Sequence, residues 1–353
     1  MSLLYARMEK MKYFNFDGRF ELESGKYLDG ISIAYHTYGK LNEEKSNAIW
    51  ICHALTANSD VMEWWPGVVG KGCVIDPEHH FIICANILGS CYGSTGPGSK
   101  NAASGKAYLH DFPLITIRDM VNAHRLLFDH LGLKNLYLLS GGSMGGYQAL
   151  EWVVMQPELT DRLFLLATCA RETAWGIAIH TAQRLAIEAD ATWKTDKIEA
   201  GKEGLKAARA IAMLTYRNYN TYKLTQDEPD LNKLDHFKAS SYILHQGNKL
   251  AQRFHAYTYW TLSKAMDSHN LSRNRSNNVA SVLQQIRQNT LIIGIENDLL
   301  CPIPEVKNLA DNIPNSTFHE IDSIYGHDGF LTEHVRIAEL VLEWMSKVKG
   351  IGD

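Results

Sequence analysis

The sequence predicts an α/β protein in which a mostly parallel sheet is interrupted by a long helical insertion. Continuous apolar runs of strand length occur at 48–53, 81–86 and 163–168, as expected of strands buried on both faces. Helical patterns alternate with these runs, and strand–helix alternation produces parallel sheets covered by helices on both sides. Between residues 171 and 287 the pattern changes, because helical spacing continues there without any strand-like alternation.

The composition excludes several classes of function. The 353-residue chain is 45% hydrophobic and 21% charged, which is typical of soluble globular proteins. Its net charge of −4 and the lack of a lysine–arginine run argue against a nucleic-acid or membrane partner. We expect no membrane span and no signal peptide, since no apolar stretch has the required length or position. The six scattered cysteines indicate a cytoplasmic protein without a metal site.

The first third of the chain contains the predicted start of the sheet. Residues 31–38 alternate between polar and apolar side chains, which predicts an early antiparallel strand. The runs at 48–53 and 81–86 predict buried strands. Residues 117–131 have apolar side chains at helical spacing, and Gly132 ends this crossover helix.

The rest of the chain predicts a core divided by an insertion. We expect one α/β core domain from residues 1–170 and 288–353, with a helical lid from 171–287. The lid is predicted to lie over the sheet, and its last helical stretch is rich in aromatic residues. The predicted elements are a strand at 163–168, lid helices at 173–189, 204–217 and 239–266, strands at 290–295 and 316–321, and a final helix at 333–349.

A glycine-rich turn between a predicted strand and a predicted helix carries the candidate nucleophile. The segment 141–145 reads Gly-Gly-Ser-Met-Gly and matches G-x-S-x-G. In a nucleophile elbow the serine lies on a strained turn, and the glycines let neighbouring backbone pass without a Cβ clash. The following helix N-terminus can receive an oxyanion. Because a strand precedes and a helix follows, we interpret Ser143 as a nucleophile rather than part of a simple turn.

Two later loops complete a triad in the order that an α/β-hydrolase fold requires. That fold places the acid and then the histidine after the serine, each on a loop that follows a strand. Asp298 follows the strand that ends at residue 295, and His327 follows the next strand. His327 would take the serine proton, and Asp298 would orient the imidazole. Glu296 is the alternative acid.

The oxyanion hole is predicted at the loop after an early strand. Such a hole needs a backbone N–H from this loop and a second one from the residue after the nucleophile. Leu55 and Met144 are the candidates. His53, at the end of the strand, is expected to be a structural histidine that bonds to the loop.

Short motifs that together match one known family are spread over the chain. They lie at 53–56, 86–89, 93–97, 111–113, 116–120, 141–152, 208–209, 214–217 and 325–328. By these motifs the chain resembles the homoserine O-acetyltransferase family. The resemblance implies transfer of an acetyl group from acetyl-CoA to the hydroxyl of L-homoserine, a step towards methionine, and a homodimer that pairs through the helical lid. We expect a ping-pong reaction and no permanently bound cofactor.

The resemblance also implies residues that bind the amino-acid substrate. Arg209 would hold the substrate carboxylate and Asp328 its ammonium group, as a zwitterion requires one fixed cation and one fixed anion. Tyr216 would line the same pocket. The sequence alone favours a solvated surface residue for Arg209, and it offers a helix N-cap as the alternative role for Asp328. Only the resemblance favours the substrate roles of these two residues. For Tyr216, a packed helix aromatic is an equal alternative.

Several departures from the family pattern leave the substrates open. They lie at 57–60, at 88–91, at Cys301-Pro302 and in a shortened stretch between 189 and 204. Within the family, serine could replace homoserine, or succinyl-CoA could replace acetyl-CoA. Outside it, the same triad could serve an esterase or thioesterase, and a hydrolase-fold binding protein without turnover is the remaining alternative.

Overall fold

The computed structural model describes residues 10–276 and 278–348, and it contains one eight-stranded sheet. The strand order is β1-β2-β4-β3-β5-β6-β7-β8. The pairs β1–β2 and β2–β4 are antiparallel, and every other pair is parallel, so the prediction of a mostly parallel sheet is confirmed. The strands are β1 Lys12–Glu21, β2 Tyr27–Tyr38, β3 Ala48–Cys52, β4 Phe81–Ala85, β5 Leu138–Gly142, β6 Arg162–Leu166, β7 Asn289–Ile295 and β8 Ser316–Ile321.

Strand β1 has no counterpart in the sequence prediction. Most of its side chains are exposed or half-buried, and its pairing with β2 shifts register between Phe16 and Arg19. Strand β2 also begins before the predicted strand at 31–38, and Gly30 within it has a φ of 80°. A glycine inside a strand usually marks an irregularity and breaks the alternating pattern. The sequence signal for this hairpin is therefore weak.

Helices cover both faces of the sheet. Trp50, Leu139 and Trp152 belong to a hydrophobic cluster on the face covered by α2 and α3. Phe164 and Trp344 belong to a second cluster on the face covered by α1 and α12. The helices of this part are α1 Val61–Trp64, α2 Ile117–His130, α3 Met144–Met155, α9 Val279–Leu283, α10 Ile303–Asn312, α11 Gly329–Thr332 and α12 His334–Lys347.

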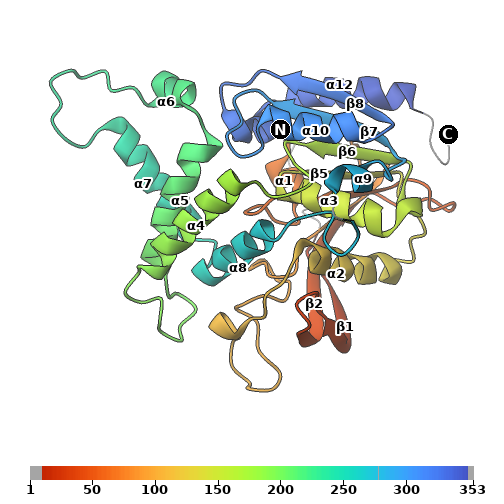
Figure 1. The fold of residues 1–353 in the computed structure, drawn as a ribbon, viewed down its shortest axis with the longest axis horizontal. Coiled ribbons are helices and arrows are strands. Elements are labelled where there is room, and N and C mark those ends of the chain that lie inside the picture. The colour runs from red at the N-terminus through yellow and green to blue at the C-terminus, as the bar shows by residue number, and fades with distance from the viewer. Residues whose placement is uncertain (1–9, 277, 349–353) are drawn as a thin grey trace, which may run out of the picture.

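The segment between β6 and β7 forms helices that project from one side of the sheet (Figure 1). The predicted single helix at 239–266 is wrong, because α7 ends at Ala251 and α8 begins at Ala256. No glycine or proline marks this break. Phe254 is buried within the turn, so tertiary packing rather than local sequence accounts for it. The helices are α4 Ala174–Glu188, α5 Lys202–Tyr216, α6 Tyr219–Gln226, α7 Lys238–Ala251 and α8 Ala256–Asp267.

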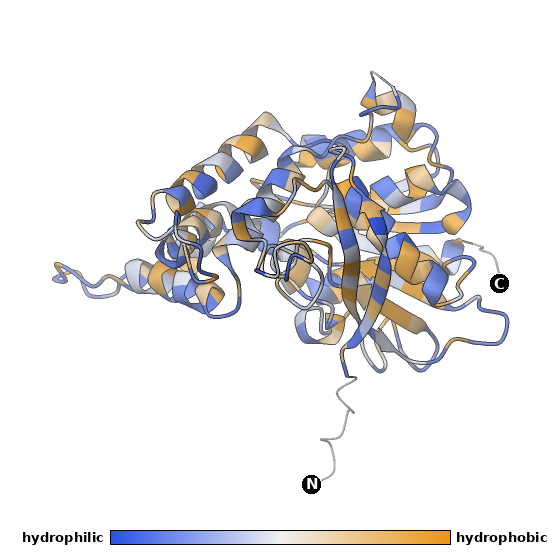
Figure 2. Cartoon of the chain, turned by 90° about the horizontal axis from the view of Figure 1, so that it is seen from below, coloured by the Kyte–Doolittle hydropathy of each residue, from blue (hydrophilic) through white to orange (hydrophobic). Residues whose placement is uncertain are grey.

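Hydrophobic and hydrophilic residues are interspersed along the lid helices (Figure 2). Leu231 and Leu234, in the loop between α6 and α7, are 94% and 93% exposed. Among the described residues, no helix combines the length and apolar character needed to cross a membrane.

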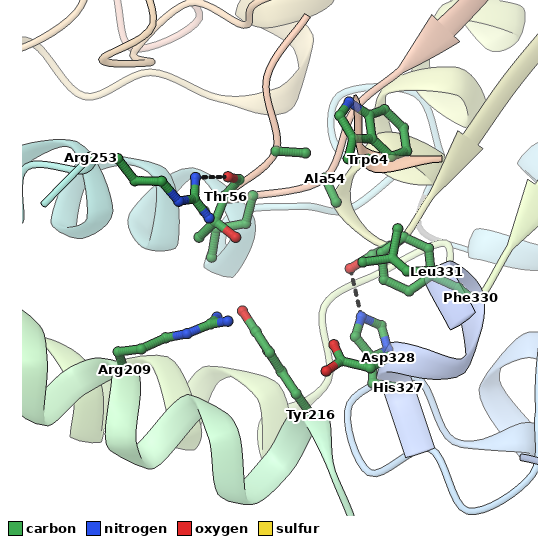
Figure 3. A pocket seen from close by; sticks show the side chains of 13 residues that line it. Ala54, Thr56, Trp64, Arg209, Tyr216, Arg253, His327, Asp328, Phe330 and Leu331 are labelled. Atoms are coloured by element: carbon green, nitrogen blue, oxygen red, sulfur yellow. Dashed lines mark hydrogen bonds between the residues drawn. The ribbon is translucent and has the colours of Figure 1, made fainter. Parts of the chain in front are cut away.

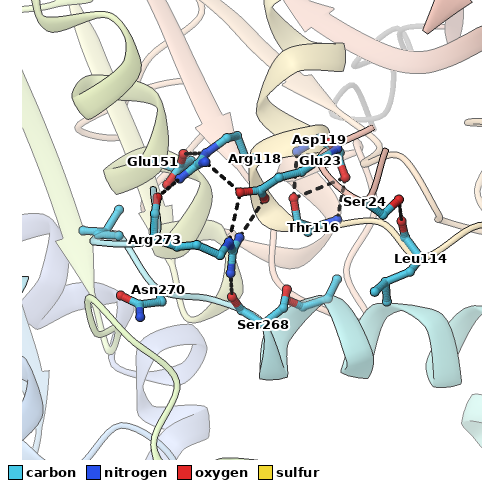
Figure 4. A network of polar contacts seen from close by, with 12 residues as sticks. Glu23, Ser24, Leu114, Thr116, Arg118, Asp119, Glu151, Ser268, Asn270 and Arg273 are labelled. Carbon is cyan, nitrogen blue, oxygen red and sulfur yellow. Dashed lines mark hydrogen bonds and ion pairs between the residues drawn. The ribbon is translucent and has the colours of Figure 1, made fainter. Parts of the chain in front are cut away.

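A network of ion pairs ties the chain that returns from the lid to the core (Figure 4). Arg118 of α2 lies 2.6 Å from both Glu23, in the β1–β2 turn, and Glu151 of α3. Arg273, which follows α8, lies 2.7 Å from the second oxygen of Glu23. Because Glu151 belongs to the helix that begins at the glycine-rich turn, this network helps to fix that helix.

Candidate active site

Ser143 lies on a strained turn between β5 and α3. Its φ of 54° and ψ of −128° are rarely adopted by residues with a side chain, and such strain costs about 1–3 kcal/mol. A Cβ on Gly141 would lie 2.2 Å from the Gly145 carbonyl oxygen, and one on Gly145 would lie 2.1 Å from that of Cys52. Both glycines of the motif are therefore required by backbone packing, as the elbow interpretation predicts.

Ser143, His327 and Asp298 form a continuous hydrogen-bonded chain. His327 Nε2 lies 2.9 Å from Ser143 Oγ, and His327 Nδ1 lies 2.7 Å from Asp298 Oδ2. The other carboxylate oxygen of Asp298 accepts the backbone N–H groups of Leu300 and Cys301, at 2.7 and 2.9 Å. Glu296, the alternative acid, is exposed. The structure thus brings the three predicted triad residues together.

The surroundings of His327 favour its protonated form. Burial of the imidazole by itself lowers its pKa. The charge and hydrogen bond of Asp298, together with the charge of Asp328, outweigh this effect, and the net pKa of His327 is raised. The ring can therefore accept the serine proton and be stabilised as the imidazolium.

The two predicted oxyanion donors flank the serine. Leu55 lines the same cavity as Ser143, and Met144 is the first residue of α3. In the described part of the chain, neither backbone N–H has a protein acceptor. Both are thus available to an oxyanion, as the helix N-terminus also favours.

His53 has the structural role that the sequence analysis expects. Its Nε2 accepts the backbone N–H of Ile87 at 3.2 Å, so its Nδ1 donates to the Ala54 carbonyl at 2.8 Å. Burial lowers the pKa of His53 to about 4, which keeps the ring neutral. The side chain of Gln148 donates to the His53 carbonyl at 3.1 Å. These bonds fix the start of the oxyanion loop.

A cavity of about 220 Å³ brings the predicted substrate residues to the serine (Figure 3). Arg209 enters from the lid with its guanidinium carbon 5.0 Å from the Tyr216 ring centre, and its Nη1 is buried without a partner. The Tyr216 ring is centred 5.9 Å from that of His327. The lining residues are Ala54, Leu55, Thr56, Ala57, Trp64, Ser143, Arg209, Tyr216, Arg253, His327, Asp328, Phe330 and Leu331.

Asp328 lines the cavity and also forms an ion pair with an arginine of the lid. It occupies the N-cap position of α11, but its side chain makes no cap bond there. Its Oδ2 instead lies 2.7 Å from Nε of Arg217, at the end of α5. Burial raises the pKa of Asp328, and the charges of Arg217, Arg209 and His327 partly offset this rise.

Arg217, Trp64 and Arg253 are polar or aromatic residues at this site to which the sequence analysis assigns no role. Arg217 appears in a family motif, at 214–217, but its partner becomes visible only in the folded chain. Trp64 and Arg253 line the cavity from segments that carry no recognisable signal.

The triad region has the spacing of a metal site but not its chemistry. Ligand atoms of Asp298, Cys301 and His327 lie within 4.8 Å of one another. The carboxylate of Asp298, however, already accepts three hydrogen bonds. A hydrogen bond with the Cys169 thiol and burial raise the pKa of Cys301 well above its ordinary value, so its thiol stays protonated. The group suits proton transfer rather than metal binding.

Comparisons with known proteins give the family. The model of the α/β hydrolase fold matches residues 47–334. The chain is 43% identical over 339 residues to the homoserine O-acetyltransferase of Trichormus variabilis, covering 95% of this chain and 94% of that protein.

Two solved structures share the fold at 24% sequence identity. The homoserine O-acetyltransferase from Bacillus anthracis superposes with a TM-score of 0.87, covering 95% of this chain and 97% of that one. Esterase E22 has a TM-score of 0.85, covering 96% and 100%. The fold alone is therefore shared by an acetyltransferase and an esterase. The 43% identity to the Trichormus protein is what indicates the acetyltransferase family. The chain belongs to the α/β-hydrolase fold and, within it, to the homoserine O-acetyltransferase family.

Proposed function

We propose that this enzyme transfers an acetyl group from acetyl-CoA to the hydroxyl of L-homoserine. One observation carries the proposal: a single cavity is lined by the Ser143–His327 pair, by Arg209, whose Nη1 has no partner, and by the carboxylate of Asp328, while Asp298 supports His327 by a hydrogen bond. The triad suits acyl transfer, and Arg209 and Asp328 suit a zwitterionic amino acid. The name of the 43% identical relative supports the same substrate.

The first half-reaction acylates Ser143. His327 takes the hydroxyl proton as Ser143 Oγ attacks the thioester carbonyl, and the oxyanion accepts the N–H groups of Leu55 and Met144. The carbon–sulfur bond then breaks, and His327 returns the proton to the departing thiolate. The products are acetyl-Ser143 and free CoA.

The second half-reaction transfers the acetyl group to homoserine. Arg209 binds the substrate carboxylate, and Asp328 binds its ammonium through the carboxylate oxygen that does not face Arg217. His327 removes the hydroxyl proton, the oxygen attacks acetyl-Ser143, and the serine leaves with its proton restored. A cavity of about 220 Å³ supports binding of donor and acceptor in turn, and hence a ping-pong scheme. Intersecting rather than parallel kinetic lines would contradict it.

A matrix of two donors and two acceptors tests the substrates. Acetyl-CoA and succinyl-CoA are each combined with L-homoserine and L-serine, and free-thiol release is measured. We expect the highest kcat/KM for acetyl-CoA with homoserine. Activity with serine alone, or with succinyl-CoA alone, would overturn the substrate assignment and keep the mechanism.

A hydrolase is the second candidate, because esterase E22 has the same fold. A hydrolase releases acetate from acetyl-CoA at the same rate with and without homoserine. A transferase gives O-acetylhomoserine and little acetate, because a well-placed hydroxyl outcompetes water. Failure of Ser143 to react with a fluorophosphonate would instead favour a binding protein without turnover.

We also propose a cytoplasmic homodimer that pairs through the lid. All six cysteines are free thiols, which agrees with a reducing compartment. Leu231, Leu234 and Leu244 expose most of their side chains on the lid, and a second copy would cover such surface. Sedimentation of wild type and of L231E/L234E tests the dimer, since these charges should produce monomers only if this surface pairs.

A further inference from the structure

Arg253 is a cation in the active-site cavity that the amino-acid acceptor does not require. It lies in the turn between α7 and α8 and lines the cavity with Ser143. Figure 3 shows Arg253 and Arg209 extending from the lid side, opposite His327. A zwitterionic acceptor needs one cation and one anion, and Arg209 and Asp328 already supply them. The positive charge of Arg253 therefore has no role in binding the acceptor.

The guanidinium of Arg253 is positioned but not neutralised. Its Nη1 donates to the Thr56 carbonyl at 2.7 Å and to the hydroxyl of Tyr92. In the described residues no carboxylate forms an ion pair with it, and its Nε and Nη2 have no protein acceptor. The side chain is exposed. One nitrogen thus fixes the group, while the others remain free for a ligand.

The size of the cavity indicates which ligand reaches these free donors. At about 220 Å³ it is smaller than the roughly 300–1,000 Å³ of pockets that hold drug-sized ligands. An acyl-CoA is larger than such a ligand, so most of its length stays outside when the thioester reaches Ser143. Being exposed and part of the lining, Arg253 lies where the donor leaves the cavity. An arginine there suits phosphate or carboxylate, to which it can donate two parallel hydrogen bonds.

We propose that Arg253 is a binding site for an anionic group of the acyl donor. This inference rests on the proposed acyl-CoA reaction and adds a residue for its first substrate. The anionic group is a phosphate of the CoA moiety or, with a longer donor, the terminal carboxylate of the acyl chain. The hydrogen bond to the Thr56 carbonyl places this site beside the oxyanion loop. The loop that donates to the oxyanion therefore also positions the side chain that binds the donor.

The test compares three donors on three variants at saturating homoserine. The variants are R253Q, R253K and, as a matched control on α7, K249Q, which removes an exposed cation away from the cavity. The donors are acetyl-CoA, S-acetylpantetheine, which has no phosphate, and succinyl-CoA. We expect R253Q to lower kcat/KM for acetyl-CoA by about tenfold or more and to leave that for S-acetylpantetheine within about twofold. R253K should recover part of the loss, and K249Q should behave as wild type.

The pattern across donors identifies the anionic group. Loss with both CoA thioesters supports phosphate, and loss with succinyl-CoA alone supports the acyl carboxylate. Equal loss with all three donors would overturn the proposal, because Arg253 would then act by holding Thr56. No loss with any donor would overturn it as well. The KM for homoserine should not change.

Calorimetry with unreactive ligands separates this inference from the proposed reaction. Free CoA and free pantetheine are titrated into wild type and R253Q. Weaker binding of CoA, with unchanged binding of pantetheine, supports the phosphate site even if homoserine proves to be the wrong acceptor. Equal CoA affinity in the two proteins contradicts the phosphate site. If wild type turns over no donor with homoserine, the proposed function is refuted, but the CoA-binding result for Arg253 still stands.

Discussion

The core and the lid contribute to the same cavity in different ways. The core supplies Ser143 and His327, with Asp298 hydrogen-bonded to His327, and the glycines beside Ser143 pack against neighbouring backbone. The lid supplies Arg209, with a buried nitrogen that has no partner, and the exposed Arg253. The contrast teaches that the reaction depends on groups already joined by hydrogen bonds, while the lid contributes to the choice of substrate through arginine nitrogens that have no protein acceptor.

The largest effect should come from the core residue that forms the covalent bond. S143A removes the nucleophile, and we expect kcat to fall by about 10⁴-fold or more. The circular-dichroism spectrum should stay unchanged, because alanine keeps the backbone of the turn. Mass spectrometry after mixing with acetyl-CoA should detect an acetyl adduct on wild type and none on the variant. An adduct on S143A would place the nucleophile elsewhere.

The second prediction concerns the electrostatic support of His327 by Asp298. D298N keeps the shape but removes the charge, and kcat should fall by about 10³–10⁴-fold. In wild type the base is lost as pH falls through the raised pKa of His327. Without the Asp298 charge that pKa drops, so the acid limb of kcat/KM should move to lower pH. A reduced rate with an unmoved limb would show that Asp298 only orients the ring.

Removing the charge of Arg209 on the lid should have a smaller effect, confined to the half-reaction with homoserine. R209Q should raise the KM for homoserine by about 10- to 100-fold, because it removes a charge-assisted bond to the carboxylate. The rate of acetylation by acetyl-CoA, measured as a thiol burst, should stay near that of wild type. K206Q, one turn earlier on α5, is the control. An equal loss in both half-reactions would mean that the division between core and lid is wrong.

The smallest effect is expected for the hydroxyl of Tyr216. Y216F keeps the ring beside Arg209 and His327, so we expect less than about a threefold change in the KM for homoserine. Y216A removes the ring and should raise that KM by about tenfold. Steady-state kinetics on both variants separates the two contributions. If Y216F raises the KM for homoserine as much as Y216A does, the hydroxyl rather than the ring contacts the substrate.

The same contrast separates what the sequence could predict from what it could not. The elbow was predictable because Gly141 and Gly145 have fixed spacing around Ser143, and the strand and helix beside them have strong local patterns. The order of Asp298 and His327 followed from strand ends in the same way.

The missed features depend on contacts between distant segments. The ion pair of Arg217 with Asp328 and the tie of Arg253 to Thr56 join residues more than 100 positions apart in the chain. The break between α7 and α8 has no local breaker, and β1 is an edge strand with a weak pattern. None of these has a short-range signal that sequence reasoning could use.

The contact of Gly145 with the end of β3 has a consequence for how such an enzyme could acquire new substrates. Because the elbow backbone lies directly against Cys52, and the oxyanion loop begins one residue later, nucleophile and oxyanion donor form one mechanical unit. A substitution that shifted one would displace the other. We therefore expect directed evolution towards a different donor or acceptor to accumulate changes in the helices between β6 and β7, and to leave this pair of backbone segments untouched.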